Sequence, residues 1–432
     1  MCKSIEVLKS LVYEGVKNKQ IAVTDVVLDR ISYELSVIES NNSVEYFLLY
    51  SKIIEVCNEL NLIRTYGRGS AAGSLVNYCL DITKINPIAE KLLFERFILP
   101  EQNRLPDIDI DIPNGSKQKV IENLKEKHPE YFVYYIALTG NYYENCELVF
   151  HENICYKKQP NGLIITREKI EEDVFIYENE EYHFTNDTKN NPIFDSKFDL
   201  IELEYLNKLQ SIVNEIGEEF HPYKLPLNDE KVFEFFVNGN LEKVFQFNTL
   251  GVKKYIEMFE PNSIHDLSII NAMYRPGLIE HIPQIVENKF DIDKLFQFSN
   301  SRLNNILGET YGVLIYQETF FIICNELAGM SFSEAENWKR RIFRDKTKNE
   351  ILAFKNYFIE ACEKNSTLKQ IEISRLINII SDILYMTFLK AHSLSYSIVG
   401  YWGAYYKTYF KKEFDNAFNS DSTFKKFEFL EL

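Results

Sequence analysis

Three aspartates alternate with isoleucines in the segment PDIDIDI at residues 106–112. Successive side chains of a β-strand point to opposite faces, so we expect Asp107, Asp109 and Asp111 on one face and the isoleucines in the core. Aspartates two positions apart lie about 6.6 Å apart along a strand, close enough to converge on cations spaced about 3.5–4 Å, as in two-metal phosphoryl transfer. Such carboxylates repel one another without a cation. The alternative is a solvated strand edge, and the spacing favours a metal site.

A further carboxylate is needed to complete such a site, and the segment SKFDL at 196–200 offers Asp199 between the apolar residues Phe198 and Leu200. Taken alone, this pattern favours a surface aspartate on an amphipathic strand. Its value as a metal ligand depends on the strand at 106–112.

Small residues dominate the segment GRGSAAGSL at 67–75, which leads into an apolar, helical stretch. Small residues let the backbone approach a phosphate, and the unpaired amides at a helix start favour negative charge. We therefore expect an anion site here, with an ordinary glycine-rich turn as the alternative. The segment is not a P-loop, because the sequence contains no G-x-x-x-x-G-K-[ST].

The densest basic patch of the chain is a second candidate for phosphate contacts, because guanidinium groups form bidentate bonds with phosphates. A solvated helix face is the alternative. The patch comprises Lys339, Arg340, Arg341, Arg344, Lys346 and Lys348.

The surrounding elements follow from hydrophobic periodicity. Apolar residues at helical spacing predict helices over 3–16, 24–39 and 46–60, and again from about 206 to the end. Residues 106–205 are strand-like, with an acidic stretch at 168–181 that we interpret as a solvated loop. The sequence therefore predicts an α+β protein with a mixed sheet between helical parts.

The composition narrows the class of protein. The 432 residues carry a formal charge of −16 and are 45% hydrophobic, which excludes disorder and a disulfide-stapled miniprotein. Apolar runs are far shorter than the roughly 18 residues that span a bilayer, and the seven cysteines form no C-x-x-C pair. We expect a cytoplasmic protein with reduced cysteines and no membrane association.

Several blocks, in this order and spacing, resemble the C-family DNA polymerases, the catalytic alpha subunits of bacterial DNA polymerase III. The resemblance runs from near residue 5 to about 418. The blocks are GRGSAAGSL at 67–75, LLFERF at 92–97, PDIDID at 106–111, KFDLIEL at 197–203, VFQF at 244–247, YRPG at 274–277, YGVLIYQE at 311–318, KRR at 339–341 and FLKAHS at 388–393.

The resemblance implies a fold and a division into domains. It implies a polymerase-β-like nucleotidyltransferase palm over 1–117 and 156–205, a reduced thumb-like insertion over 118–155, and a large helical fingers domain over 206–432. The segment before Asp199 is shorter than is usual in the family, which is why we expect the thumb to be reduced.

The resemblance also implies site residues and ligands. Asp107, Asp109 and Asp199 would hold two Mg²⁺ ions, with Mn²⁺ as an alternative, and Asp111 is a further candidate ligand. His392 has a core histidine as its alternative. The residues expected to contact the deoxynucleoside triphosphate are Gly69, Ser70, Arg96, Arg275, Arg340, Arg341, Lys390 and His392.

The implied activity is that of a transferase of DNA replication: template-dependent DNA polymerisation on primer-template DNA. We find no segment matching the family's PHP, clamp-binding or OB-fold regions. We therefore expect no clamp binding from this chain alone and low processivity. Two alternatives remain open at this point: a nucleotidyltransferase without templating, and a catalytically inactive polymerase-like binding protein.

Overall fold

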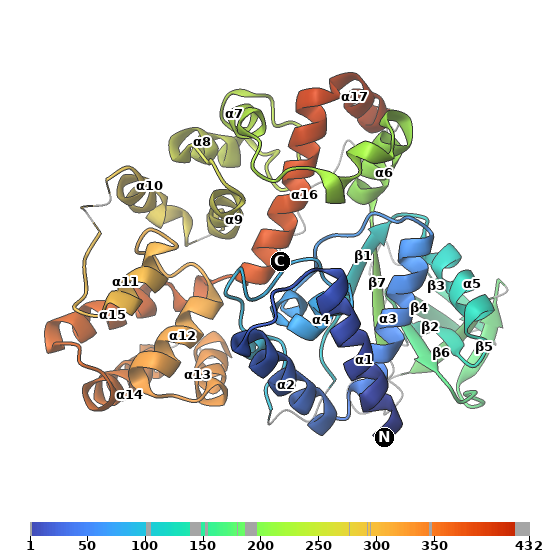
Figure 1. Ribbon diagram of the computed structural model, residues 1–432, viewed down its shortest axis with the longest axis horizontal. Coiled ribbons are helices and arrows are strands. Elements are labelled where there is room, and N and C mark those ends of the chain that lie inside the picture. Colours follow the sequence, from blue (N-terminus) through green and yellow to red (C-terminus); the bar gives the residue numbers. More distant parts are fainter. Residues whose placement is uncertain are drawn as a thin grey trace. The chain divides into compact units, whose positions relative to one another are not determined.

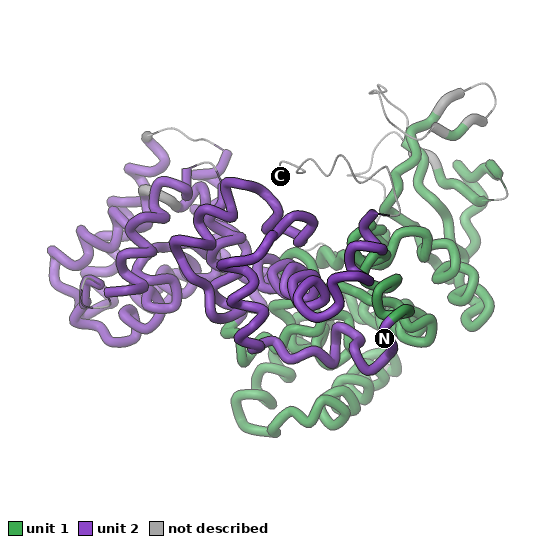
Figure 2. Tube along the Cα trace, turned by 90° about the horizontal axis from the view of Figure 1, so that it is seen from above, with its two compact units in different colours: residues 1–91, 102–215 green, residues 92–101, 216–432 purple. Residues whose placement is uncertain are grey.

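The computed structural model describes residues 2–100, 105–138, 148–151, 154–178, 180–185, 197–275, 277–291, 293, 295–344 and 348–419. The chain forms two compact units (Figure 2). The first comprises residues 1–91 and 102–215, and the second comprises residues 92–101 and 216–432. Helices together with a mixed sheet confirm the predicted α+β class.

The first unit opens with three amphipathic helices, α1 (Cys2–Asn18), α2 (Asp25–Ser40) and α3 (Val44–Glu59). In α2 the periodic residues Val27, Ile31 and Leu35 are buried, and the Thr24 hydroxyl caps the helix by accepting a hydrogen bond from the amide of Val27. These bounds confirm the three predicted helices to within a few residues.

The first unit contains a seven-stranded sheet (Figure 1). The strand order is β1-β7-β4-β2-β6-β5, and β3 pairs with β4 outside this path. The pairs β1/β7 and β2/β6 are parallel, while the remaining pairs are antiparallel. The strands are β1 (Asp109–Pro113), β2 (Phe132–Leu138), β3 (Leu148–His151), β4 (Ile154–Thr166), β5 (Val174–Tyr177), β6 (Glu180–Thr185) and β7 (Lys197–Leu203).

Helix α3 packs against one face of the sheet beside α5 (Lys117–Lys127), as Figure 1 shows. The rings of Tyr46 and Tyr50 on α3 lie 4.8 and 4.9 Å from the ring of Phe198 on β7. This aromatic contact fixes which face of β7 points into the core. The unit also contains the short helix α4 (Leu75–Cys79) and ends in α6 (Glu204–Ile216).

The acidic stretch at 168–181 is only partly a loop, so the loop prediction is wrong for its second half. Strands β5 and β6 form an antiparallel pair there. The rings of Phe175 and Tyr182 are stacked 5.6 Å apart and both are buried, so these aromatic residues outweigh their charged neighbours.

The second unit is helical in its described part, and its longest helix, α16, packs against α7, α9 and α17. No described helix of the chain is both long and apolar enough to cross a membrane. The helices are α7 (Glu230–Asn238), α8 (Leu250–Phe259), α9 (Ile264–Met273), α10 (Ile282–Phe290), α11 (Ser301–Gly308), α12 (Gln317–Ala328), α13 (Phe332–Arg344), α14 (Lys348–Asn365), α15 (Gln370–Ile383), α16 (Lys390–Tyr409) and α17 (Lys411–Asn419).

Candidate active site

An acidic cluster lies where β1 runs beside β7 in the first unit. Their parallel pairing sets Asp109 directly opposite Asp199, and Asp107 lies on the segment that leads into β1. One carboxylate oxygen from each of these three aspartates lies within 4.8 Å of the other two. The structure therefore brings together the three residues that the sequence nominates as metal ligands. That they bind a metal stays a prediction.

Buried neighbours hold these carboxylates on the open face of the strands. Ile108 and Ile110 flank Asp109, and Phe198 and Leu200 flank Asp199; all four side chains are at most 3% exposed. A slip of one residue in either strand would exchange a buried apolar side chain for an aspartate. The hydrophobic pattern thus fixes the register that forms the cluster.

The electrostatics of the cluster fit a divalent cation. Burial, followed by the negative charges of Asp107 and Asp199, raises the pKa of Asp109 to about 7. Two cations partly offset the charge: Arg68, with its Nε 3.6 Å from Oδ2 of Asp109, and Lys197, with its Nζ 2.6 Å from Oδ2 of Asp199. Converging carboxylate oxygens are the hard donors that Mg²⁺ prefers, and a cation would relieve their mutual repulsion.

Asp111 lies outside the acidic cluster. Its side chain is buried, with one carboxylate oxygen 2.9 Å from the Thr65 hydroxyl and the other 3.1 Å from Nη1 of Arg68. These bonds give Asp111 a structural role: it anchors the strand to Thr65, just before the glycine-rich block, and to Arg68 within that block.

The start of α4, at the end of the glycine-rich block, has no unpaired amides at Leu75 and Val76 to offer an external anion. This finding corrects the expectation of an anion site at that helix start. The amides of Leu75 and Val76 at the start of α4 both donate to the carboxylate of Glu34, at 2.9 Å. The amide of Asn77 donates to the Ser74 hydroxyl at 3.1 Å. The anion that the sequence predicts at this helix is therefore a buried side chain of the protein itself.

Gly69 and Ser70 lie before that occupied helix start, on a turn whose surface is partly exposed. Gly69 has a φ of +59°, a conformation that favours glycine, and the space beside its Cα is open. Their contact with a nucleotide stays a prediction.

In the second unit, the carboxylate of Glu336 on α13 forms ion pairs with Arg96, Lys339 and Arg340. We call these four residues the Glu336 cluster. Oε2 of Glu336 lies 3.2 Å from Nη1 of Arg96 and 3.0 Å from Nζ of Lys339, and Oε1 lies 2.8 Å from Nε of Arg340. Arg96 also donates to Oε1 of Gln317 at 2.8 Å. Burial and then the charge of Arg96 lower the pKa of Lys339 to about 8. Three cations around one carboxylate leave an excess of positive charge.

Arg341 lies on α13 outside this cluster. It pairs with Glu350 at 2.8 Å and lies over the ring of Trp338, with its guanidinium carbon 4.2 Å from the ring centroid. Lys346 falls outside the described residues.

Arg275, Lys390 and His392 also lie in the second unit. Arg275 lies over the ring of Phe388 at 3.6 Å, and burial lowers its pKa. Lys390 is buried, with its Nζ 3.1 Å from Oε2 of Glu309. His392 is 8% exposed and packs on Tyr396 with ring centroids 4.1 Å apart. Nucleotide contact stays a prediction for all three residues.

Sequence reasoning missed three residues that support these groups: Lys197, Tyr50 and Glu336. A signal existed for Lys197, because it precedes Asp199 by two positions and therefore shares its face of the strand. A second signal existed for Glu336, which precedes Lys339 and Arg340 by three and four positions on a helix. No sequence signal indicated Tyr50.

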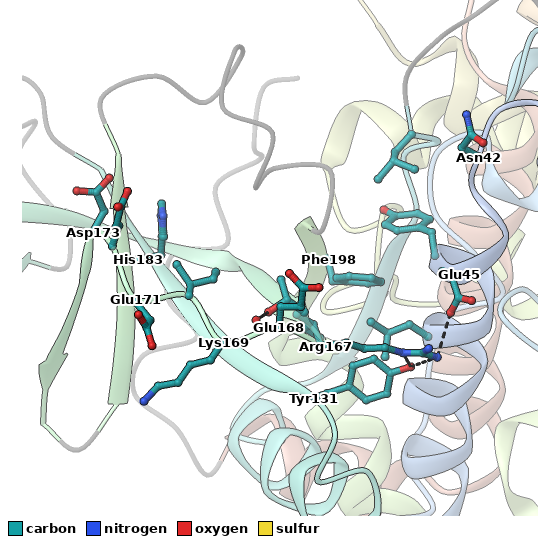
Figure 3. Close-up of a pocket in the computed structure, with 17 residues that line it drawn as sticks. Asn42, Glu45, Tyr131, Arg167, Glu168, Lys169, Glu171, Asp173, His183 and Phe198 are labelled. Carbon is teal, nitrogen blue, oxygen red and sulfur yellow. Dashed lines mark hydrogen bonds and ion pairs between the residues drawn. The ribbon is translucent and has the colours of Figure 1, made fainter. Parts of the chain in front are cut away.

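The first unit also contains a pocket of about 1010 Å³, drawn in Figure 3. Phe198 lines it, whereas Lys197 and Asp199, its neighbours on β7, do not. Arg167 lies within it between Glu45, at 3.0 Å, and the hydroxyl of Tyr131, as the dashed lines show. The pocket is therefore separate from the acidic cluster.

Comparison with known families finds two matches in the chain. Residues 6–147 match the bacterial DNA polymerase III alpha NTPase domain, and residues 202–366 match the bacterial DNA polymerase III alpha subunit finger domain.

Two similar proteins bear the name DNA polymerase III subunit alpha. That of Ureaplasma parvum serovar 3 is 29% identical over 493 aligned residues, covering 99% of this chain and 51% of the relative. That of Staphylococcus aureus strain MRSA252 is 28% identical over 455 aligned residues, covering 90% of this chain and 42% of the relative. The chain thus spans about half the length of the curated relatives it matches.

Proposed function

Because this chain is a relative of the alpha subunits of bacterial DNA polymerase III, we propose that it is a DNA-directed DNA polymerase. It would add deoxynucleotides to a primer 3′ end on a DNA template. The observation that carries the proposal is the acidic cluster, in which Asp109 pairs with Asp199 and Asp107 lies within reach of both.

In this proposal residues 1–117 and 156–205 form a polymerase-β-like palm, with a reduced thumb at 118–155. Residues 206–432 would be the fingers. The match of residues 202–366 to a finger domain supports the last assignment.

Asp107, Asp109 and Asp199 would hold two Mg²⁺ ions, which Mn²⁺ could replace. Bound at such a site, divalent cations ease deprotonation of an attacking hydroxyl and stabilise a leaving pyrophosphate. The protein's own part is to hold the carboxylates on paired strands whose register the buried side chains fix.

In this proposal each unit has its own nucleotide-binding residues: Gly69 and Ser70 in the first unit, and basic residues in the second. The Glu336 cluster supports this assignment, because its three cations exceed its single carboxylate. Nε of Arg96 is also buried without a hydrogen-bond partner among the described residues, a donor that an anion would satisfy. The second-unit residues are Arg96, Arg275, Arg340, Arg341, Lys390 and His392.

We further propose that each DNA encounter adds only a few nucleotides. Phosphate contacts supply most sequence-independent DNA affinity, and a net formal charge of −16 leaves these contacts to local groups of cations.

Primer extension with Mg²⁺ or Mn²⁺ on a defined template tests the function. Asp109→Asn should lower incorporation at least a hundredfold while leaving the melting temperature within a few degrees, because it removes one proposed ligand. Asp29→Asn, on the exposed face of α2, is the matched control and should keep full activity. Full activity of Asp109→Asn would refute the metal site. Addition that ignores the template would instead identify a nucleotidyltransferase without templating.

A further inference from the structure

The hydroxyl of Tyr50 bonds the backbone of both chain segments that carry the acidic cluster. Tyr50 lies on α3 and is completely buried. Its hydroxyl donates a hydrogen bond to the carbonyl of Ile108 and accepts one from the amide of Asp199, at 3.4 Å. A single side-chain oxygen therefore links the residue between Asp107 and Asp109 to the backbone of Asp199.

This link lies where the strand pairing begins. The ladder between β1 and β7 starts at the pair Asp109 and Asp199, so Ile108 and Asp107 lie before its first rung. Strands are normally held by direct amide-to-carbonyl bonds. Here a hydroxyl on a rigid aromatic ring stands between the carbonyl of Ile108, directly before β1, and the amide of Asp199 on β7.

Tyr46, one helical turn before Tyr50, strengthens the arrangement. Its hydroxyl donates to the carbonyl of Lys197 at 3.2 Å, and both tyrosine rings pack on Phe198. Because the rings are buried against one another and against β7, the hydroxyl of Tyr50 has little freedom to move.

We infer that Tyr50 is a positioning residue of the proposed polymerase site: its hydroxyl sets the separation between the strand ends that carry Asp107 and Asp109 on one side and Asp199 on the other. Without the Tyr50 hydroxyl, the carbonyl of Ile108 and the amide of Asp199 would each lose a hydrogen-bond partner. Alternatively, they would bond to each other directly and draw the two chain segments together. Both outcomes change the spacing of the three carboxylates. The inference rests on the proposed function, because it concerns metal binding by that cluster.

The test is Tyr50→Phe, which keeps the ring and removes only the hydroxyl. We expect Mn²⁺ affinity, measured by electron paramagnetic resonance on the full chain without DNA, to fall about fivefold. We expect kcat for nucleotide incorporation to fall about tenfold while KM for the nucleotide stays within twofold, since small misplacements at a reacting centre cost rate.

The matched control is Tyr134→Phe in the same unit. Tyr134 is also fully buried, and its hydroxyl accepts a hydrogen bond from the amide of Ile170 at 3.0 Å, away from the acidic cluster. The Tyr134→Phe variant should lose about as much free energy of unfolding as Tyr50→Phe but keep wild-type Mn²⁺ affinity and kcat. If Tyr50→Phe does not fold, Tyr46→Phe tests the inference indirectly: it removes the hydroxyl that lies 3.5 Å from that of Tyr50, and we expect a threefold loss of Mn²⁺ affinity.

The outcomes separate this inference from the proposed function. If Tyr50→Phe matches Tyr134→Phe in Mn²⁺ affinity and in kcat, Tyr50 is merely a core residue and the inference is wrong. A wild-type chain that neither binds Mn²⁺ nor incorporates nucleotides would instead overturn the proposed function, and this inference with it.

Discussion

We expect Asp81 to hold the segment after the glycine-rich block in place. The loss in free energy of unfolding caused by Asp81→Asn shows how much this contact contributes. The carboxylate of Asp81 bonds Lys19 at 2.8 Å, Arg64 at 3.0 Å and Lys84 at 2.9 Å. The side chain of Arg64 is only 1% exposed, so the substitution leaves a buried cation without its carboxylate. Removing one partner of a buried pair costs about 3–5 kcal/mol. Because a quarter of the Asp81 side chain is exposed, we expect the lower end, about 3 kcal/mol at pH 7.

The same contacts determine the direction in which folding stability changes with pH. Burial opposes ionisation of Asp81, but Lys84, Arg64 and Lys19 together hold its pKa below the usual value of 3.8. An acid whose pKa is depressed in the folded state contributes stability above pH 3.8, and that contribution is lost as the pH falls through the folded-state pKa. The difference between wild type and Asp81→Asn should therefore be constant from pH 7 to about 5 and shrink below pH 3.8.

Urea unfolding at several pH values, followed by circular dichroism, measures this difference. In thermal unfolding of a unit of this size, a loss of about 3 kcal/mol in the free energy of unfolding corresponds to a drop of roughly 6–12 °C in Tm. Asp29→Asn, an exposed aspartate, is the control and should change stability by less than about 0.5 kcal/mol. A difference under about 1 kcal/mol at pH 7, or one that stays unchanged at pH 3, would refute the reasoning.

Two further predictions concern the groups that were expected to bind phosphate. Glu34→Ala should cost about 3 kcal/mol of stability and speed hydrogen exchange at Leu75 and Val76, because it removes the buried acceptor of their amides; unchanged exchange would contradict the capping role. Arg341→Ala should raise KM for the nucleotide about fivefold while DNA affinity, measured by fluorescence anisotropy, falls less than twofold, since a half-exposed guanidinium contributes about 1 kcal/mol. A fall in DNA affinity alone would make Arg341 a template contact.

Local sequence patterns predicted much of the secondary structure of the first unit. The helical spacing of apolar residues located α1 to α3, and the Ile-Asp alternation located β1 to within three residues. The grouping of Asp107 and Asp109 followed from the same alternation, because the period of a strand is a property of the backbone. The resemblance to the polymerase III alpha family is confirmed by the family matches.

What the sequence could not predict depends on partners far away along the chain. Glu34 bonds the amide of Leu75 from 41 positions away, and Tyr46 reaches the carbonyl of Lys197 across 151 positions. The burial of Asp111 likewise depends on Thr65 and the guanidinium of Arg68. Periodicity reports which face of an element is apolar, but not which distant polar group will satisfy a given amide or carboxylate.

The short segment 92–101 has a consequence for how this protein can be divided experimentally. The chain passes between the two units at residues 91/92, 101/102 and 215/216, so neither unit is a single stretch of sequence. Arg96 lies on this segment, yet its partners Glu336 and Gln317 lie beyond residue 216. A fragment starting at 216 would carry Glu336 without Arg96, whereas a permuted or fused gene that joins 92–101 to 216–432 would keep the pair together.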